Sequence, residues 1–285
     1  MSSTPSNPAL TLYDIKMAPP IATSSCAPNP WKARQALNFK SVPFKTTWVD
    51  LPDITKTRTS LGVPAGRQFA DGSDFYTLPV LVNEETGEKI GDSLDIAIYL
   101  DEKFPDAGKG RLLPDVDVQF LLEYSYKDTD ILIPLSGISA TASQPKYAPY
   151  AHFNRHVDAA FTAHTLLMAY GMKFVPETAE VTKAEFARRA SMPSFEAFRV
   201  EGEPRRAIME SFKSALWDLA RVINRDTGGP FILGERVCHA DFIVGGWLRF
   251  ARVCLFPEEW EEVREWHGGV FGRVFDELGV FREIK

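Results

Sequence analysis

The sequence predicts an α/β domain followed by an all-α domain, and three observations support this prediction. Two strand-like segments, residues 9–16 and 46–51, flank a helical segment that starts at residue 30. A strand, a helix and a second strand in this order form a parallel pair with a crossover helix. Strand patterns stop after Pro114, and beyond it apolar residues recur only at helical spacing. The 285 residues are enough for two domains of ordinary size.

Composition, charge and cysteine count argue against several classes of protein. The net charge of −6 and a pI near 5.5 provide no basic field for phosphates, so no nucleic-acid partner is expected. No segment is apolar for long enough to span a bilayer, and the first 20 residues lack a signal-peptide pattern, which predicts a cytoplasmic protein without membrane contact. The three cysteines have neither disulfide nor metal-ligand spacing; this fits a reducing compartment and no metal.

The predicted first domain covers residues 9–104. Residues 1–8, rich in Ser, Pro and Asn, are expected to form a flexible tail. Alternating apolar residues predict the first strand, and Pro30 fits the first turn of the helix that follows. Residues 55–76 contain several glycines and little periodicity, which predicts mostly loop, with a short helical turn as an alternative for part of it.

The rest of the first domain contains an unusual proline. Residues 77–83 are strand-like despite Pro79, which is most simply explained by a cis bond before it. Residues 84–90 then predict a turn and a short hairpin partner. A helix follows over 92–103, with Asp92 at its start, and 105–114 are predicted to be a linker.

Residues 115–285 are predicted to form a helical bundle. The helical stripes cover 116–133, 150–174, 183–200, 206–224, 240–255 and 258–274. Most aromatic residues here are expected in the core, with one helix face lining an apolar pocket. The basic run at 185–192 indicates a solvated helix face. His152 and His156 are spaced i,i+4 without an acidic third ligand, so we expect no metal there.

The segment before the first helix contains Ser24, Ser25, Cys26 and Asn29. A helix start leaves N–H groups unpaired and carries a partial positive charge, which stabilises an anion. A thiolate is such an anion, and it could belong to the protein or to a ligand. The alternative is ordinary N-capping by the polar side chains.

Two further features could belong to the same site. A cis bond between Leu78 and Pro79 would expose backbone N–H and C=O groups to a partner, whereas the alternative is an edge-strand proline. Asp92 and Ser93 open a helix, where a hydroxyl and N–H groups could hold a carboxylate; the alternative is again a cap.

In this order the elements resemble a thioredoxin-like domain, and the whole chain resembles the glutathione transferases. It is more similar still to the fungal etherase-like class, which is related to bacterial lignin β-etherases. The resemblance lies in "APNPWKARQALNFK" (27–40), "YTLPVLV" (76–82), "GDSLDIAIYLDEKFP" (91–105) and "FILGERVCHADFIVGGWLRF" (231–250). It implies a glutathione-binding first domain, a helical domain with a hydrophobic acceptor pocket, and a homodimer.

The resemblance also implies a glutathione site. Backbone groups at Leu78 and Pro79 would pair with the cysteinyl unit of glutathione, the co-substrate. Asp92 and Ser93 would hold its γ-glutamyl end, because that end carries an ammonium for Asp92 and a carboxylate for the helix N-terminus. In the block "VCHADF" a structural, capping role is implied for Asp241.

Ala27 departs from the family pattern. Similar etherase-like transferases have serine here, which is expected to hydrogen-bond the glutathione thiolate, whereas alanine has no side-chain donor. The helix start with the N–H groups near Ala27 and Asn29 could still stabilise the thiolate, or Ser25 or Cys26 could reach it through a shifted loop.

Three functions therefore stay open. The first is a detoxifying transferase that acts on hydrophobic aromatic compounds such as wood phenols and lignin fragments. The second is a ligandin, which binds such compounds with little or no catalysis because Ala27 replaces the serine. The third is a thiol transferase that uses Cys26, as omega-type transferases use a cysteine at this place.

Overall fold

A mixed four-stranded sheet forms the centre of the first half of the molecule. The computed structural model describes residues 9–115, 131–225 and 228–285. The strands β1 (Leu10–Ile15), β2 (Phe44–Val49), β5 (Val80–Asn83) and β6 (Lys89–Ile90) lie in the order β2-β1-β5-β6. β1 is parallel to β2, as the crossover pattern predicts, and β5 is antiparallel to β6, as the hairpin predicts; β1 and β5 are also antiparallel.

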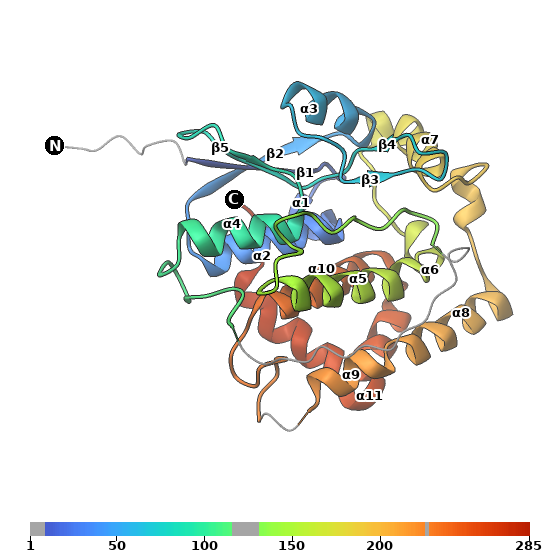
Figure 1. Cartoon of the computed structure of the whole chain (residues 1–285). Coiled ribbons are helices and arrows are strands. Elements are labelled where there is room, and N and C mark those ends of the chain that lie inside the picture. Colours follow the sequence, from blue (N-terminus) through green and yellow to red (C-terminus); the bar gives the residue numbers. More distant parts are fainter. Residues whose placement is uncertain (1–8, 116–130, 226–227) are drawn as a thin grey trace.

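Helices cover both faces of this sheet. On one face lie α2 (Pro28–Phe39) and α4 (Ser93–Lys103), and α3 (Ile54–Ser60) lies on the other (Figure 1). The short η1 (Leu51–Asp53) leads into α3, and α1 (Ile21–Ser24) precedes α2. This arrangement of a mixed sheet with a following helical domain confirms the predicted thioredoxin-like first half and all-helical second half.

One segment of the first half differs from the prediction, and one cis peptide bond was not foreseen. Residues 55–76 contain α3 and a small hairpin of β3 (Arg67–Gln68) and β4 (Asp74–Phe75), where we expected mainly loop. Each hairpin strand has only two residues, which is too short for alternation to be recognised. The predicted cis bond at Leu78–Pro79 is present, and Pro19–Pro20 is a second one.

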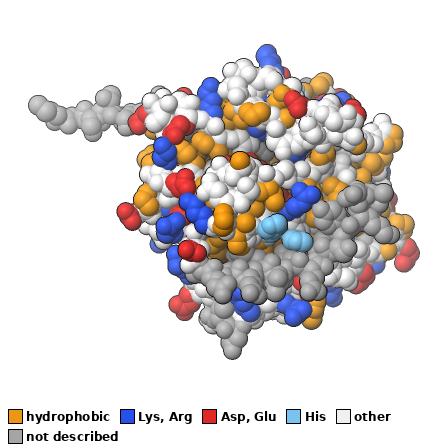
Figure 2. Space-filling model, in the orientation of Figure 1, with side chains coloured by type: hydrophobic (Ala, Val, Ile, Leu, Met, Phe, Trp, Pro, Cys, Tyr) orange, Lys and Arg blue, Asp and Glu red, His pale blue; other side chains and the backbone are white. Residues whose placement is uncertain are grey.

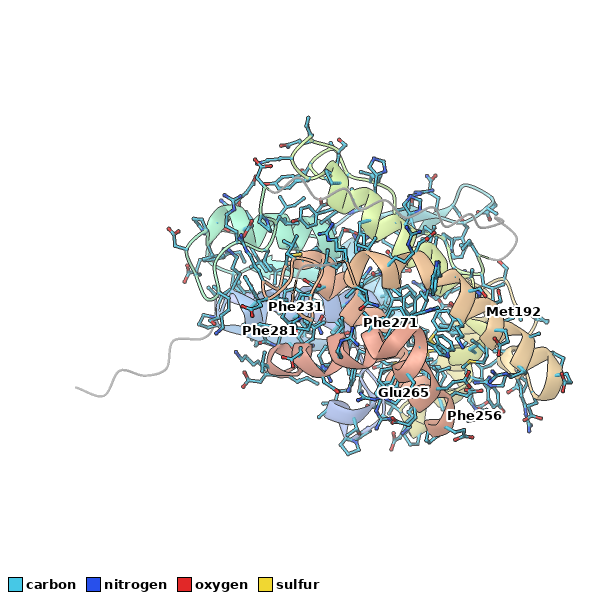
Figure 3. The ribbon with its side chains drawn as sticks, turned by 90° about the horizontal axis from the view of Figure 1, so that it is seen from below. Met192, Phe231, Phe256, Glu265, Phe271 and Phe281 are labelled. Atoms are coloured by element: carbon cyan, nitrogen blue, oxygen red, sulfur yellow. The ribbon has the colours of Figure 1, made fainter. Side chains whose placement is uncertain are left out.

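The second half consists of helices packed around α10. Its α-helices are α5 (Ala148–Thr162), α6 (Leu166–Ala169), α7 (Ala179–Arg189), α8 (Gly202–Ala215), α9 (Trp217–Ile223), α10 (His239–Cys254) and α11 (Pro257–Glu277). Single 3-10 turns are η3 (Pro176–Thr178), η4 (Phe195–Phe198) and η5 (Leu278–Phe281). Figure 3 shows this half from below, with the exposed Phe256 at its edge and the buried Phe271 within the bundle.

Two predicted segments lie wholly or largely outside the described residues, and a predicted helix is shorter than expected. The tail over 1–8 and nearly all of the helix over 116–133 lie outside the described residues. The predicted helix over 183–200 ends at Arg189, and a separate 3-10 turn follows it. In the described part of the chain, no helix is long and apolar enough to cross a membrane.

Contact between α2 and α10 joins the two halves. Phe39 and Phe242 pack edge to face with ring centroids 5.8 Å apart. Close approach at the other end of α2 requires Gly246, because a Cβ there would lie 2.5 Å from the Pro28 carbonyl oxygen. Asp241 holds the start of α10 by accepting hydrogen bonds of 2.8 Å from the Ile232 and Cys238 N–H groups, which confirms its structural role. The beginning of α2 is therefore fixed against the second half.

Candidate active site

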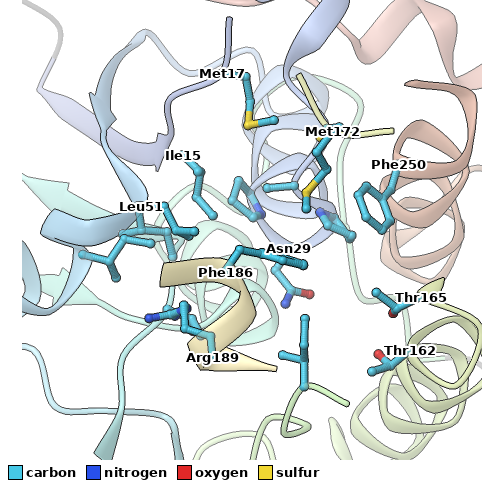
Figure 4. A pocket seen from close by; sticks show the side chains of 18 of the residues that line it. Ile15, Met17, Asn29, Leu51, Thr162, Thr165, Met172, Phe186, Arg189 and Phe250 are labelled. Atoms are coloured by element: carbon cyan, nitrogen blue, oxygen red, sulfur yellow. The ribbon is translucent and has the colours of Figure 1, made fainter. Parts of the chain in front are cut away.

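A cavity of about 140 Å³ lies between the two halves, beside the start of α2 (Figure 4). Its wall is mainly apolar. The first half contributes Ile15, Met17 and Leu51, and the second half contributes Met172, Phe186 and Phe250. A cavity with such walls excludes water from apolar ligands and strengthens the few polar contacts inside it.

The start of α2 forms one side of the cavity, and Ala27 and Asn29 line it. Ala27 is the N-cap residue and has no side-chain cap hydrogen bond. Pro28 and Pro30 lack an N–H, so Asn29 carries the only backbone N–H among residues 28–30. The Asn29 side chain lies within the cavity (Figure 4) and makes no hydrogen bond to the described residues. One residue thus presents a free backbone donor and a free amide at the helix terminus.

The loop before α2 is held from behind. The Ser25 carbonyl accepts hydrogen bonds from Trp31 Nε1 at 2.9 Å and from Arg249 Nε at 3.0 Å. The Ser25 hydroxyl is fully buried, has no partner in the described structure and does not line the cavity. Ser24 donates to the Ala18 carbonyl. The alternative that these serines cap α2 is therefore wrong, because Ala27 occupies the cap position.

Cys26 contributes to the cavity wall, although its side chain is only 1% exposed. Burial raises the pKa of the Cys254 thiol well above its ordinary value, and a hydrogen bond with Cys26 adds to this effect. In the residues that the structure describes, no group of three or more His, Cys, Asp or Glu side chains could hold a metal ion.

Two buried arginines organise the backbone around the cis-proline. Arg58 donates to the carbonyls of Thr77 at 2.6 Å and Gly91 at 2.9 Å, and Arg189 donates to the Tyr76 carbonyl. Leu78 lines the cavity, and its own N–H and C=O have no partner among the described residues. The carbonyls of Tyr76 and Thr77 thus have hydrogen-bond partners, whereas the N–H and C=O of Leu78 remain available to a ligand.

Arg189 corrects one sequence-based expectation. It belongs to the basic run at 185–192, which we expected to face solvent, but it is 6% exposed and lies over the Phe75 ring at 4.3 Å. Burial lowers its pKa to about 10. Helical periodicity offers a signal for this, because Phe186 lies three residues earlier on the same face of α7 and also lines the cavity.

Asp92 and Ser93 lie beside the cavity rather than in its wall. Asp92 caps α4 by accepting the Leu94 N–H at 2.8 Å, as predicted, and opens on a neighbouring cleft. Ser93 is buried at the first position of α4. Asp92 therefore remains accessible to a ligand from this cleft.

Arg67 connects the cavity and the cleft. Its guanidinium lines the cavity and donates to Ser136 Oγ at 3.0 Å and to the Pro134 carbonyl at 2.7 Å. Burial lowers its pKa, and the nearby carboxylates of Asp158 and Asp92 oppose that change. Sequence reasoning did not identify this residue, because it lies in the two-residue strand β3.

A buried polar network forms the floor of the cavity. Lys32 Nζ donates to Asp158 Oδ1 at 2.5 Å and to Asn154 Oδ1 at 2.8 Å. Trp247 Nε1 donates to the same Asp158 oxygen at 2.6 Å. Burial lowers the pKa of Lys32, and the Asp158 carboxylate counteracts this. Sequence reasoning missed the network because its members come from α2, α5 and α10.

Together, the fold and the site define a class: a two-domain protein whose thioredoxin-like half presents a cis-proline edge and a helix start to a cavity shared with a helical half. Comparisons with known proteins specify the family. Residues 27–103 match the glutathione S-transferase N-terminal domain, and residues 150–281 match the glutathione S-transferase C-terminal domain. The chain belongs to the glutathione S-transferase superfamily, which confirms the resemblance seen in the sequence.

Individual relatives support this assignment. The chain is 26% identical over 276 residues to the glutathione S-transferase-like protein ustS of Aspergillus flavus, covering 95% of this chain and 90% of that protein. A glutathione S-transferase of Ceriporiopsis subvermispora, solved in complex with glutathione, is 25% identical with a TM-score of 0.74, covering 97% of this chain and 99% of that one. Glutathione transferase GSTFuA3 of Phanerochaete chrysosporium shares the fold at 22% identity and a TM-score of 0.75, covering 98% and 100%.

Proposed function

We propose that this protein is a glutathione transferase of the etherase-like type. It takes glutathione as co-substrate and acts on hydrophobic aromatic compounds, of the wood-phenol or lignin-fragment kind, in a detoxifying role. The observation that carries the proposal is the apolar cavity shared by both halves, with the start of α2 in its wall. We further propose that it works as a cytoplasmic homodimer.

Glutathione would lie along the edge of the first half. The free N–H and C=O of Leu78, held beside Pro79, suit antiparallel pairing with the cysteinyl backbone. Asp92 would attract the ammonium of the γ-glutamyl end, and Ser93 with the start of α4 would take its carboxylate. The glutathione-bound relative from Ceriporiopsis subvermispora supports glutathione as the ligand.

The chemistry would be nucleophilic substitution by the glutathione sulfur. The start of α2 and the free N–H and amide of Asn29, next to Ala27, favour the thiolate over the thiol and release its proton to solvent. The thiolate then forms a carbon–sulfur bond with an electrophilic carbon of the acceptor, and the bond to the leaving group breaks. For a β-aryl ether the leaving group departs as an aryloxide.

Two alternatives each rest on a specific residue. Ala27 brings no hydroxyl to the thiol, which favours a ligandin that binds aromatic molecules with little catalysis. Cys26 lies in the cavity wall in contact with Cys254, which favours glutathione-dependent thiol exchange. Against the exchange reaction, Cys26 is almost fully buried, as an inert packing cysteine would be.

Turnover separates these functions. Glutathione conjugation of an aromatic electrophile and cleavage of a β-aryl ether model compound are measured next to binding of an aromatic dye. The proposal expects both turnover and dye binding at micromolar strength. Dye binding without either reaction would establish the ligandin, and disulfide exchange that Cys26→Ser abolishes would establish the thiol transferase.

A further inference from the structure

Two threonine hydroxyls on α5 and just after it face the cavity without a partner. Thr162 is 5% exposed and Thr165 is 3% exposed, and both line the cavity. Neither hydroxyl makes a hydrogen bond within the described residues, although both side chains are nearly enclosed. In Figure 4 they stand next to each other, on the wall that carries α5 and Phe250.

Their position makes these hydroxyls available to a ligand. Each oxygen is open to the cavity rather than sealed among protein atoms, so it can form a hydrogen bond with water or with a ligand oxygen there. The nearby polar group on α5 is already occupied, because Asp158 Oδ1 accepts from both Lys32 and Trp247. The remainder of this wall is apolar, with Phe250 beside the two threonines. The pair therefore places two adjacent hydroxyls on a wall suited to an aromatic ring, whereas Thr182, also buried and without a hydrogen bond in the described residues, brings a single hydroxyl to the α7 wall.

We propose that Thr162 and Thr165 determine acceptor specificity by binding an oxygen substituent, a phenolic hydroxyl or a carbonyl, carried on the aromatic ring. This inference rests on the proposed function and names the chemical class of its acceptor. Each hydroxyl can donate to a carbonyl or accept from a phenol, so both kinds of oxygen are suitable. A ring that bears a methyl group at the same place leaves both hydroxyls unsatisfied, and a site built in this way discriminates against it.

The test uses binding alone, with no glutathione present. Equilibrium dialysis measures the dissociation constants of 2-naphthol and 2-methylnaphthalene, which differ by a hydroxyl in place of a methyl group of similar size. The readout is the ratio of the two constants in each variant relative to wild type, so the greater hydrophobicity of the methyl compound cancels. Thr162→Val and Thr165→Val keep the branched shape and remove one hydroxyl each. Thr162→Ser keeps the hydroxyl, and Thr182→Val makes the same change on the α7 wall of the same cavity.

We expect each valine variant on the α5 wall to reduce the preference for 2-naphthol by about threefold, and the double variant by about tenfold. Thr162→Ser and Thr182→Val should keep the wild-type ratio. An unchanged ratio in the double variant would overturn the inference and leave the proposed function standing. A reduced preference in Thr182→Val, with none in the two valine variants of the α5 wall, would also overturn the inference and leave the proposed function standing. Failure of the wild type to bind either naphthalene would overturn both.

Discussion

Ala27, Pro28 and Pro30 decide how many donors the start of α2 can offer to an anion. The two prolines remove N–H groups, and the alanine brings no hydroxyl, so the polar contacts left at this terminus belong to Asn29. Most helix starts have several free N–H groups in the first turn. A thiolate beside this one would depend on few hydrogen bonds, and adding one should have a measurable effect.

Ala27→Ser tests this dependence. The new hydroxyl should form a charge-assisted hydrogen bond with the glutathione thiolate, worth roughly 1.5–3 kcal/mol. This lowers the pKa of the bound thiol by about one to two, since a change of one corresponds to about 1.4 kcal/mol. Glutathione-dependent turnover near neutral pH should rise. The thiol pKa is measured by ultraviolet titration of the thiolate, and turnover by conjugation assay.

Cys26→Ser serves as the comparison for this substitution. We expect it to change glutathione conjugation little, because the Cys26 side chain is buried against Cys254. The reverse pattern, with Ala27→Ser silent and Cys26→Ser abolishing glutathione-dependent disulfide exchange, would make Cys26 the nucleophile.

At the scale of elements, α2, α5 and α10 meet at one buried ion pair. Lys32 is fully buried, and its ammonium contacts Asp158 of α5, which also accepts from Trp247 of α10. Such a pair contributes little net stability compared with apolar residues, but removing one partner leaves the other charge buried and unpaired. The pair therefore makes the packing of these three helices sensitive to single substitutions.

Lys32→Met should lower the free energy of unfolding by about 3–5 kcal/mol, because Asp158 is left as a buried carboxylate without its cation. Urea denaturation measures the change. The double variant Lys32→Met with Asp158→Asn should lose clearly less than the sum of the two single losses. Lys103→Met, which breaks the solvent-exposed pair with Glu88, should lower the free energy of unfolding far less than Lys32→Met does. Equal losses in Lys32→Met and Lys103→Met would show that the buried pair does not hold these helices.

The first residue of α10 introduces a pH dependence. His239 is fully buried, and neither ring nitrogen has a partner in the described structure. Burial and the nearby Lys32 ammonium lower its pKa to about 3. Unfolding restores the ordinary value near 6.5, so between these two values the unfolded chain binds the additional proton. The stability associated with His239 is therefore present at pH 7 and is lost as the pH falls below about 6.5.

His239→Leu should remove this dependence. Between pH 7 and pH 5 the wild type should lose about 2 kcal/mol more of its free energy of unfolding than the variant does. Urea denaturation at the two pH values provides the comparison, and His152→Leu, at an exposed position of α5, is the control that should follow the wild type. Parallel losses in wild type and His239→Leu would mean that this histidine does not titrate on unfolding.

The surface and the interior of the molecule differ in how their charged side chains are arranged. On the face seen in Figure 2, basic and acidic side chains are interspersed around hydrophobic ones, in keeping with the modest net charge of −6. Some buried charges, Lys32, Asp158 and Arg189, lie where the two halves meet, and others, such as the ion pair of Arg34 with Asp14, lie inside the first half. The cavity lies along the same junction, so its shape depends on how the halves are held together.

The family resemblance also implies a homodimer, which the mass of the protein in solution tests. Gel filtration with light scattering at micromolar concentration should give a mass of about twice the 31.9 kDa of one chain. Mass at the single-chain value would contradict the dimer while leaving the fold unaffected, since each chain contains its own complete sheet and helical bundle.

Local patterns in the sequence determined the order of the first elements, the cap of one helix and the conformation before one proline. The order of strand, helix and strand, the Asp92 cap and the cis bond before Pro79 could all be predicted because each depends on residues within a few positions of one another. The same holds for the placement of Ala27 and Asn29 at a helix start. The family motifs extended these predictions to the two-domain fold.

Only the tertiary structure decided which side chains share the cavity. Lys32 and Asp158 are 126 positions apart, and neither has a local pattern that names the other. Arg189 belongs to a basic run that predicts a solvated face, yet α7 packs against the first half and buries it beside Phe75. Sequence periodicity reports which face of a helix is apolar, but not which distant element covers it. Contacts between elements far apart in the chain are chosen by the packing of the whole molecule, and those contacts form the floor and the far wall of the site.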